Sequence, residues 1–120
     1  MRGLGALEAA VMGVLWSTDP PLSVRGVMEV LTWPKPLAYT TVMTVLDNLY
    51  RKGYVERTMH GRAYLYRPTL SRGEAAADAI RQVLDEAVDP EAVLLHFAST
   101  VTDDESKVLR SGLNRRKRPR

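Results

Sequence analysis

The stretch from Leu37 to Pro68 constrains the fold most, because its hydrophobic period changes at a glycine. From Ala38 to Lys52, apolar side chains recur every three or four residues, which predicts an amphipathic helix. Gly53 follows the last turn, where glycine commonly ends a helix and where the two preceding cations suit the negative end of the helix dipole. The predicted buried stripe of this helix is Val42, Val45, Leu46 and Leu49.

Beyond the glycine, the hydrophobic period becomes two. This period predicts strands over Tyr54–Met59 and Arg62–Arg67, joined by a turn at His60 and Gly61, with Pro68 stopping the second strand. A helix followed directly by a tight basic hairpin predicts the recognition helix and wing of a winged helix-turn-helix. The expected fold class is therefore mainly α with a small β-hairpin, followed by C-terminal dimerisation helices.

The residues before this stretch complete the predicted winged domain. The pattern predicts helices over Leu4–Ser17 and Ser23–Leu31, with Ser23 as an N-cap, and a connecting turn over Thr32–Pro36. We expect Leu22 to pair with the hairpin as a very short strand. Trp33 is either a surface aromatic or a plug against the second helix, and burial statistics for tryptophan favour the plug.

The outer face of the predicted recognition helix is small and hydrogen-bonding near its start. Short hydroxyls allow a backbone to approach base edges, and a threonine methyl can contact a thymine methyl. The alternative is an ordinary amphipathic helix whose outer face happens to be small, but the hairpin that follows favours DNA. The candidate base-side residues are Thr40, Thr41, Met43, Thr44, Asp47 and Asn48.

Cationic and hydrogen-bonding residues around this helix are candidate phosphate contacts, which position a protein on DNA without reading its sequence. Residues 1–70 carry eight Lys or Arg against five Asp or Glu, a modest excess that many soluble domains match. The alternative is that some of the candidate cations only keep the protein soluble. For Ser23, the favoured role is that of a helix cap. Tyr64 and Tyr66 share one hairpin face, where packing over the helix is favoured over base stacking. The candidate phosphate contacts are Ser23, Arg51, Lys52, Arg57, His60, Arg62 and Arg67.

The pattern of residues 71–113 predicts three short helices. Their expected N-terminal caps are Ser71 with Glu74, Asp89, and Thr102 with Glu105. These helices cannot bury much apolar surface alone, so we expect a second copy of the chain to cover them in a two-fold dimer. We expect three regions, namely a DNA-binding domain over 1–70, a dimerisation region over 71–113 and a basic, disordered tail over 114–120. The candidate dimerisation residues are Ile80, Val83, Leu84, Val93, Leu94, Phe97, Val108 and Leu109.

Several function classes find no support in the sequence. Cysteine is absent and the two histidines lie in different regions, so we expect no metal site and no cofactor. No nucleophile, paired-carboxylate or phosphate-loop motif indicates an enzyme. No signal segment or apolar run of membrane-spanning length is present, so we expect a cytoplasmic protein without membrane insertion.

The segments AYTTVMTVLDNLYRKGYVER and GRAYLYRP resemble the penicillinase-repressor family of bacterial regulators, the BlaI/MecI/CopY type. The segments LEAAVMGVLW and LSVRGVMEVL are similar to the first two helices of that family. The resemblance implies a homodimeric repressor that blocks a promoter at a palindromic operator with TACA/TGTA-like half-sites. It also implies a membrane sensor-peptidase as a partner, with cleavage between His96 and Phe97, although relatives usually carry asparagine at the position of His96. Two other functions remain open: a winged helix used for protein interaction, and a winged regulator that senses a ligand.

Overall fold

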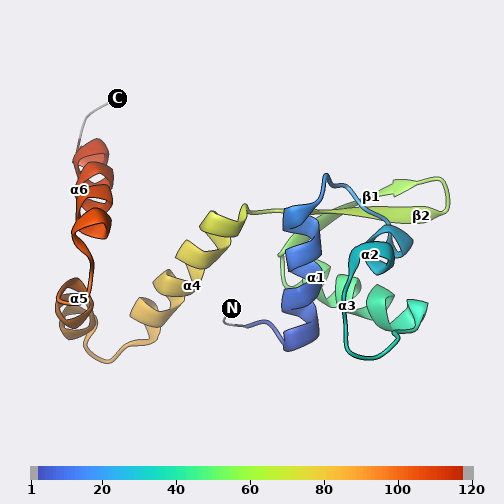
Figure 1. The fold of residues 1–120 in the computed structure, drawn as a ribbon, viewed down its shortest axis with the longest axis horizontal. Coiled ribbons are helices and arrows are strands. Elements are labelled where there is room, and N and C mark those ends of the chain that lie inside the picture. The colour runs from blue at the N-terminus through green and yellow to red at the C-terminus, as the bar shows by residue number, and fades with distance from the viewer. Residues whose placement is uncertain (1–2, 118–120) are drawn as a thin grey trace. The chain divides into compact units, whose positions relative to one another are not determined.

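The computed structural model describes residues 3–117, with the side chain of Lys117 excluded. The chain is mainly helical with one two-stranded antiparallel hairpin, which confirms the predicted fold class (Figure 1). It forms two compact units that meet within the fourth helix, between residues 80 and 81. The elements are α1 (Ala6–Ser17), α2 (Val24–Val30), α3 (Tyr39–Arg51), β1 (Val55–His60), β2 (Ala63–Pro68), α4 (Arg72–Glu86), α5 (Pro90–Ala98) and α6 (Asp103–Lys117).

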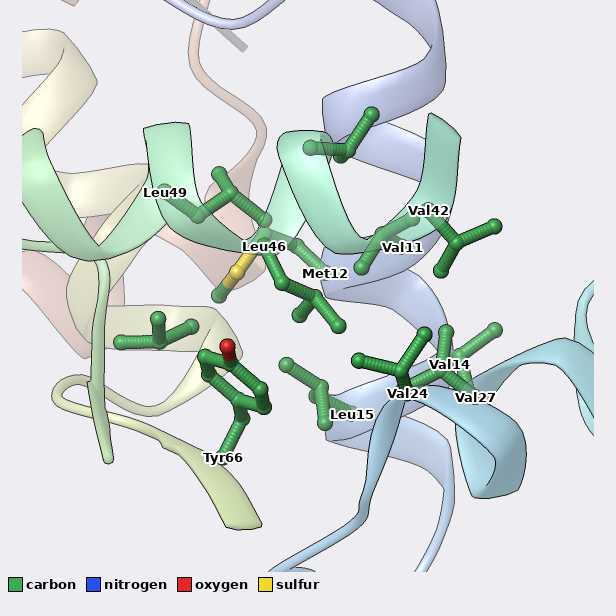
Figure 2. Close-up of a cluster of buried hydrophobic side chains, with 12 residues drawn as sticks. Val11, Met12, Val14, Leu15, Val24, Val27, Val42, Leu46, Leu49 and Tyr66 are labelled. Atoms are coloured by element: carbon green, nitrogen blue, oxygen red, sulfur yellow. The ribbon is translucent and has the colours of Figure 1, made fainter. Parts of the chain in front are cut away.

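The core of the first unit lies between α1, α2, α3 and the hairpin. The predicted stripe of α3 is confirmed, since Val42, Leu46 and Leu49 are fully buried and Val45 nearly so. Figure 2 shows Val42, Leu46 and Leu49 beside core residues of α1 and α2, with the ring of Tyr66 entering from β2. The packed stripe therefore leaves the opposite face of α3 outside the core.

The hairpin base is attached to this core, whereas the turn before α3 is more open. Trp33 is half-buried in the turn before α3 and lines an open hollow together with Met28 and Leu31, but it is not among the side chains packed on the core. Leu22 forms an isolated antiparallel bridge with Tyr66, as expected, and each backbone amide of the pair donates to the carbonyl of the other. The hairpin is thus held at its base by both packing and backbone hydrogen bonds.

The hairpin turn differs from the prediction by one residue. Register pairs Val55 with Pro68 and His60 with Ala63, so the turn consists of Gly61 and Arg62 rather than of His60 and Gly61. Gly61 has a φ of +64°, which residues with a Cβ rarely adopt, and this requirement places glycine at the first turn position. As a result, Arg62 lies at the tip of the hairpin instead of starting its second strand.

Helix caps that the sequence predicts are present in both units. The hydroxyl of Ser23 accepts a hydrogen bond from the amide of Gly26 at 3.0 Å, and the carboxylate of Asp89 accepts one from the amide of Ala92 at 3.1 Å. Ser71 and Glu74 form a reciprocal capping box at the start of α4, and its backbone and hydroxyl hydrogen bonds lower the pKa of Glu74. Thr102 and Glu105 form the same capping box at the start of α6.

The first turns of α4 belong to the first unit, past the boundary that we predict at residue 70. The indole Nε1 of Trp16 donates to the carbonyl of Leu70 at 2.9 Å. The guanidinium of Arg72 lies 5.3 Å from the centre of the Trp16 ring, and Ala75 is buried. These contacts explain why the helix that leaves the winged domain begins as part of it.

The predicted disorder of the basic tail is wrong for its first residues, because α6 continues through Asn114 to Lys117. The remaining tail residues, 118–120, lie outside the described part of the chain. The cations of the last turn suit the negative end of the helix dipole, which explains the extension in physical terms. Within residues 3–117, no helix combines the length and apolar character needed to cross a membrane.

Candidate nucleic-acid interface

The outward face of α3 carries the predicted base-side residues. Thr40, Thr41, Met43, Thr44 and Asn48 are exposed, on the side of the helix opposite the buried stripe. The hydroxyl of Thr44 donates to the backbone carbonyl of Thr40 at 2.9 Å. Because its proton is used within the helix, the Thr44 oxygen presents acceptor lone pairs and a methyl group outward.

Asp47, the sixth predicted base-side residue, is engaged by two arginines. Its Oδ2 lies 3.0 Å from Nη2 of Arg51, and its Oδ1 accepts a hydrogen bond from Nη1 of Arg57 at 3.2 Å. Both carboxylate oxygens therefore have partners before any DNA is present. Asp47 is half-buried rather than open like the threonines.

Arg57, a predicted phosphate contact, is half-buried between α3 and the hairpin. Its guanidinium carbon is 3.9 Å from the centre of the Tyr50 ring and 4.2 Å from that of Tyr64, and its side chain is only 22% exposed. Burial disfavours the charged guanidinium, but Tyr64 and the hydrogen bonds with Asp47 and Tyr66 outweigh burial and raise the pKa of Arg57. Burial raises the pKa of the Tyr66 hydroxyl, against the hydrogen bond from Arg57.

Lys52, another predicted phosphate contact, faces the N-terminal segment. Its Nζ lies 2.8 Å from Oε1 of Glu8 and donates to the carbonyl of Gly3 at 3.0 Å. The hydrogen bond from Lys52 holds the pKa of Glu8 below its ordinary value, and the amide of Gly5, which donates to the same oxygen at 2.9 Å, acts in the same direction. In this arrangement Lys52 joins α1 to the end of α3.

The other predicted phosphate contacts are more accessible. His60 and Arg62 are exposed at the end of the hairpin, and the Arg51 side chain is 74% exposed despite its ion pair. Arg67 is exposed, and its Nε lies 3.9 Å from Oε1 of Glu56, which is a long ion pair on the strand surface. Ser23 acts as the cap of α2, in agreement with its expected structural role.

A hollow of about 310 Å³ lies between α3 and the hairpin, open to the exterior. It brings the base-side residues of α3 together with the arginines and tyrosines of the hairpin. Sequence reasoning misses one cation near it: Arg25, the second residue of α2, whose guanidinium lies 5.5 Å from the ring centre of Tyr39. In the sequence, only its position two residues after the Ser23 cap could have indicated that Arg25 lies near this surface. The hollow is lined by Val24, Tyr39, Met43, Thr44, Asp47, Arg57, Arg62, Ala63, Tyr64 and Tyr66.

The predicted dimerisation residues lie in α4, α5 and α6, away from α3 in sequence. Leu84 differs from the prediction, because it is buried within its own chain. The neighbouring His96 and Phe97 of the predicted cleavage position are exposed in α5. Among the described residues, no group of three His, Cys, Asp or Glu side chains is arranged to hold a metal ion. The exposed members of the dimerisation set are Ile80, Val83, Val93, Leu94, Phe97, Val108 and Leu109.

Comparison with known proteins agrees with this geometry. A protein-family model described as penicillinase repressor matches residues 4–115. The transcriptional regulator BlaI of Mycobacterium tuberculosis is 43% identical over 113 residues, which cover 92% of this chain and 82% of that protein.

Solved structures of low sequence identity share the fold. A probable transcriptional regulator from Pseudomonas aeruginosa aligns with a TM-score of 0.52 and 18% identity, over 95% of this chain and 79% of that one. MepR, a transcription regulator of the Staphylococcus aureus multidrug efflux pump MepA, aligns with a TM-score of 0.51 and 16% identity, over 94% of this chain and 77% of that one. The helical core, exposed helix and hairpin thus form a winged helix-turn-helix, and the matching family and the BlaI relative define its class as transcriptional regulators. Within that class, the chain belongs to the penicillinase repressor family, as its sequence motifs predict.

Proposed function

We propose that this regulator is a homodimeric repressor that reads a palindromic operator with TACA/TGTA-like half-sites. The observation that carries the proposal is the exposed, uncharged threonine face at the start of α3, beside a hairpin with Arg62 at its tip. Thr40 and Thr44 enter the major groove and contact base edges, while the hairpin lies over the neighbouring phosphates. Family membership supports the repressor role, and the half-site sequence follows from the resemblance to relatives.

Exposed apolar side chains in the C-terminal helices support the homodimer. Leu94, Phe97 and Val108 are each more than half exposed in the single chain, an unfavourable state for large apolar groups in water. A second copy covers these side chains in a two-fold arrangement, and two α3 helices then meet two half-sites separated by whole helical turns.

Selection of bound sites from a random duplex pool tests the proposal. The proposal expects the wild-type protein to enrich inverted repeats that contain TACA and TGTA, and sedimentation equilibrium to give a dimer. Enrichment of unrelated or non-palindromic sites would contradict the operator assignment. Failure to shift any duplex at low salt, together with a monomeric mass, would contradict the whole function.

Control by proteolysis is the second part of the proposal. The bond between His96 and Phe97 lies in α5, and both side chains are exposed in the single chain. Cleavage there by a membrane sensor-peptidase would remove α6 and part of the proposed dimer contact, and so release the operator. Incubation with the cognate sensor followed by mass spectrometry tests this, and Phe97→Ala serves as the resistant control. An intact wild-type chain after activation of the sensor would rule out this part of the proposal and leave the operator assignment untouched.

A further inference from the structure

Arg57 is surrounded by groups of α3 and of the hairpin in a way that a phosphate contact does not require. We propose that Arg57 is a positioning residue, which clamps the hairpin to the recognition helix and so sets where Arg62 meets the DNA backbone. The inference rests on the proposed DNA-binding function and assigns a role within it. We call the four residues Asp47, Tyr50, Arg57 and Tyr64 the wing clamp.

Two aromatic rings and one carboxylate hold the guanidinium in place. Tyr50 and Tyr64 cover its plane, with ring centres 3.9 Å and 4.2 Å from the guanidinium carbon. Asp47 accepts a hydrogen bond from Nη1 at 3.2 Å. To turn outward to a phosphate, Arg57 would have to give up one carboxylate bond and two cation–π contacts, all of them made in a half-buried position.

The clamp joins three elements at the level where the hairpin leaves the core. Asp47 and Tyr50 lie one turn apart on α3, Arg57 lies on β1, and Tyr64 lies on β2. Between Arg57 and Tyr64, residues 58–63 of the hairpin are all exposed, so no buried side chain fixes the outer half. A two-stranded hairpin without packing is marginally stable in water, so beyond the core packing at the hairpin base the clamp is the side-chain contact that fixes the outer half on α3.

The clamp also explains an acidic residue on a helix face that is turned toward DNA. A free carboxylate at position 47 would repel phosphates, but here Arg51 and Arg57 neutralise it from both sides. Arg51 is mostly exposed and free to turn toward a phosphate, whereas Arg57 is held by the two rings. The pairing of Asp47 thus depends mainly on Arg57 once DNA is bound.

Lysine cannot replace arginine in such a site, because a planar guanidinium stacks on two rings and an ammonium does not. This difference separates a clamp from a phosphate contact. The test measures affinity for the palindromic duplex selected by the wild-type protein, at several salt concentrations. The variants are Arg57→Lys, Arg57→Gln and Arg62→Gln, with Arg81→Gln on α4 as a matched control for loss of one exposed arginine.

The clamp predicts that Arg57→Lys and Arg57→Gln both lower operator affinity, by roughly tenfold, while the slope of log affinity against log salt stays that of the wild type. Arg62→Gln lowers that slope by about one, as expected for one lost phosphate contact. Arg81→Gln changes neither quantity. If Arg57→Lys retains wild-type affinity and Arg57→Gln reduces the slope by about one, Arg57 is a phosphate contact and the clamp is wrong.

A double-mutant cycle adds a second readout. In the Asp47→Asn background, Arg57→Gln should cost much less operator affinity than in the wild type, because the clamp is already broken. The Arg81 and Asp85 pair, an exposed ion pair of α4, provides the control cycle and should show no coupling. Equal losses from Arg57→Gln in both backgrounds would overturn the clamp.

One measurement is independent of DNA and keeps this inference separate from the proposed function. Protons of the Arg57 side chain lie over two aromatic faces, so their NMR signals should be shifted upfield and should move back in Tyr50→Leu. Unshifted signals in the wild type would overturn the clamp even if operator binding is found. Upfield signals in a protein that binds no duplex would contradict the proposed function and leave the clamp standing.

Discussion

A single hydroxyl illustrates how the helix backbone decides what a side chain can read. Thr44 donates its proton to the carbonyl of Thr40, one turn earlier in α3. In that state its oxygen can only accept hydrogen bonds from DNA. The major-groove donors are the amino groups of adenine and cytosine, so Thr44 is suited to those bases or, through its methyl group, to thymine.

Replacement of Thr44 by valine and by alanine separates the two modes. Thr44→Val keeps the methyl and loses the oxygen, whereas Thr44→Ala loses both the oxygen and the extra methyl. If the oxygen is read, both variants should weaken operator binding by ~1–3 kcal/mol and leave random-duplex binding nearly unchanged. If the methyl is read, only Thr44→Ala should weaken it. Titration of both duplexes by fluorescence anisotropy measures the difference.

Thr100→Ala, just after α5, is the matched control, because this exposed threonine also donates its hydroxyl proton to a backbone carbonyl and belongs to neither the proposed DNA contacts nor the proposed dimer contacts. Alanine is a better helix former than threonine, so a loss of binding in Thr44→Ala would not reflect an unfolded α3. Equal losses on operator and random duplex would show that Thr44 does not contribute to base reading.

At the scale of elements, α3 is held by its buried stripe more than by its outer face. Leu46 is fully buried, and Leu46→Ala should lower the free energy of unfolding by ~3 kcal/mol because it leaves a cavity. Met43 lies on the exposed side, and Met43→Ala should change the free energy of unfolding by less than about 0.5 kcal/mol. Urea unfolding followed by circular dichroism measures both. A similar cost for the two substitutions would mean that the outer face is packed against something within the chain.

The ion pair between Lys52 and Glu8 joins the end of α3 to α1, and it makes stability depend on pH. The pKa of Glu8 in the folded protein is lower than its ordinary value of 4.5. The folded state therefore favours the carboxylate, and its contribution is complete above pH 4.5 and lost as pH falls through the lower folded pKa. Glu8→Gln keeps an acceptor for the amide of Gly5 but removes the charge.

We expect Glu8→Gln to lower the free energy of unfolding by ~1 kcal/mol at pH 7, since the partner lysine is partly exposed. The difference from the wild type should shrink below pH 4.5 and vanish in stronger acid. Glu29→Gln on α2, which removes one exposed carboxylate, is the matched control and should leave the free energy of unfolding at pH 7 nearly unchanged. A difference that persists unchanged in acid would exclude the ion pair as its cause.

Elements were predictable from the sequence where local signals determine them. Glycine at positive φ ends α3 at Gly53 and shapes the turn at Gly61, and side-chain caps start α2, α4, α5 and α6. Partners of charged side chains were not predictable. Arg57 and Lys52 look like free cations in the sequence, but their partners Asp47 and Glu8 are defined by how α3 packs on the hairpin and on α1. A periodic pattern specifies which face is buried, not which side chain meets which.

At the scale of the whole molecule, the second unit differs from the first in how little it buries. In the described part of the chain beyond residue 80, Leu84 is the one large apolar residue that is buried, whereas the winged domain has a complete core. A surface of exposed Leu, Val and Phe side chains is what a two-fold partner would cover. The sequence predicts this need for a partner, because three short amphipathic helices have no core of their own to face.

Leu94→Asp tests the dimer, because Leu94 is about half exposed in the single chain and its change should not unfold that chain. A symmetric interface contains the residue twice, so loss of two buried leucines should weaken association by ~3 kcal/mol or more. Sedimentation equilibrium should then report monomers at concentrations where the wild type is dimeric. Operator affinity should fall with it, because two linked half-site contacts become one.

Val30→Asp provides the matched control for that substitution. Val30 is a similarly exposed apolar residue, but it lies at the end of α2 in the winged domain. It should leave the association constant unchanged, because the proposed contact surface does not include α2. If both variants remain dimeric, the exposed residues of α5 do not form the contact. If Leu94→Asp is monomeric yet binds the palindrome as tightly as the wild type, each winged domain acts alone, and two-fold symmetry is not what the protein reads in its operator.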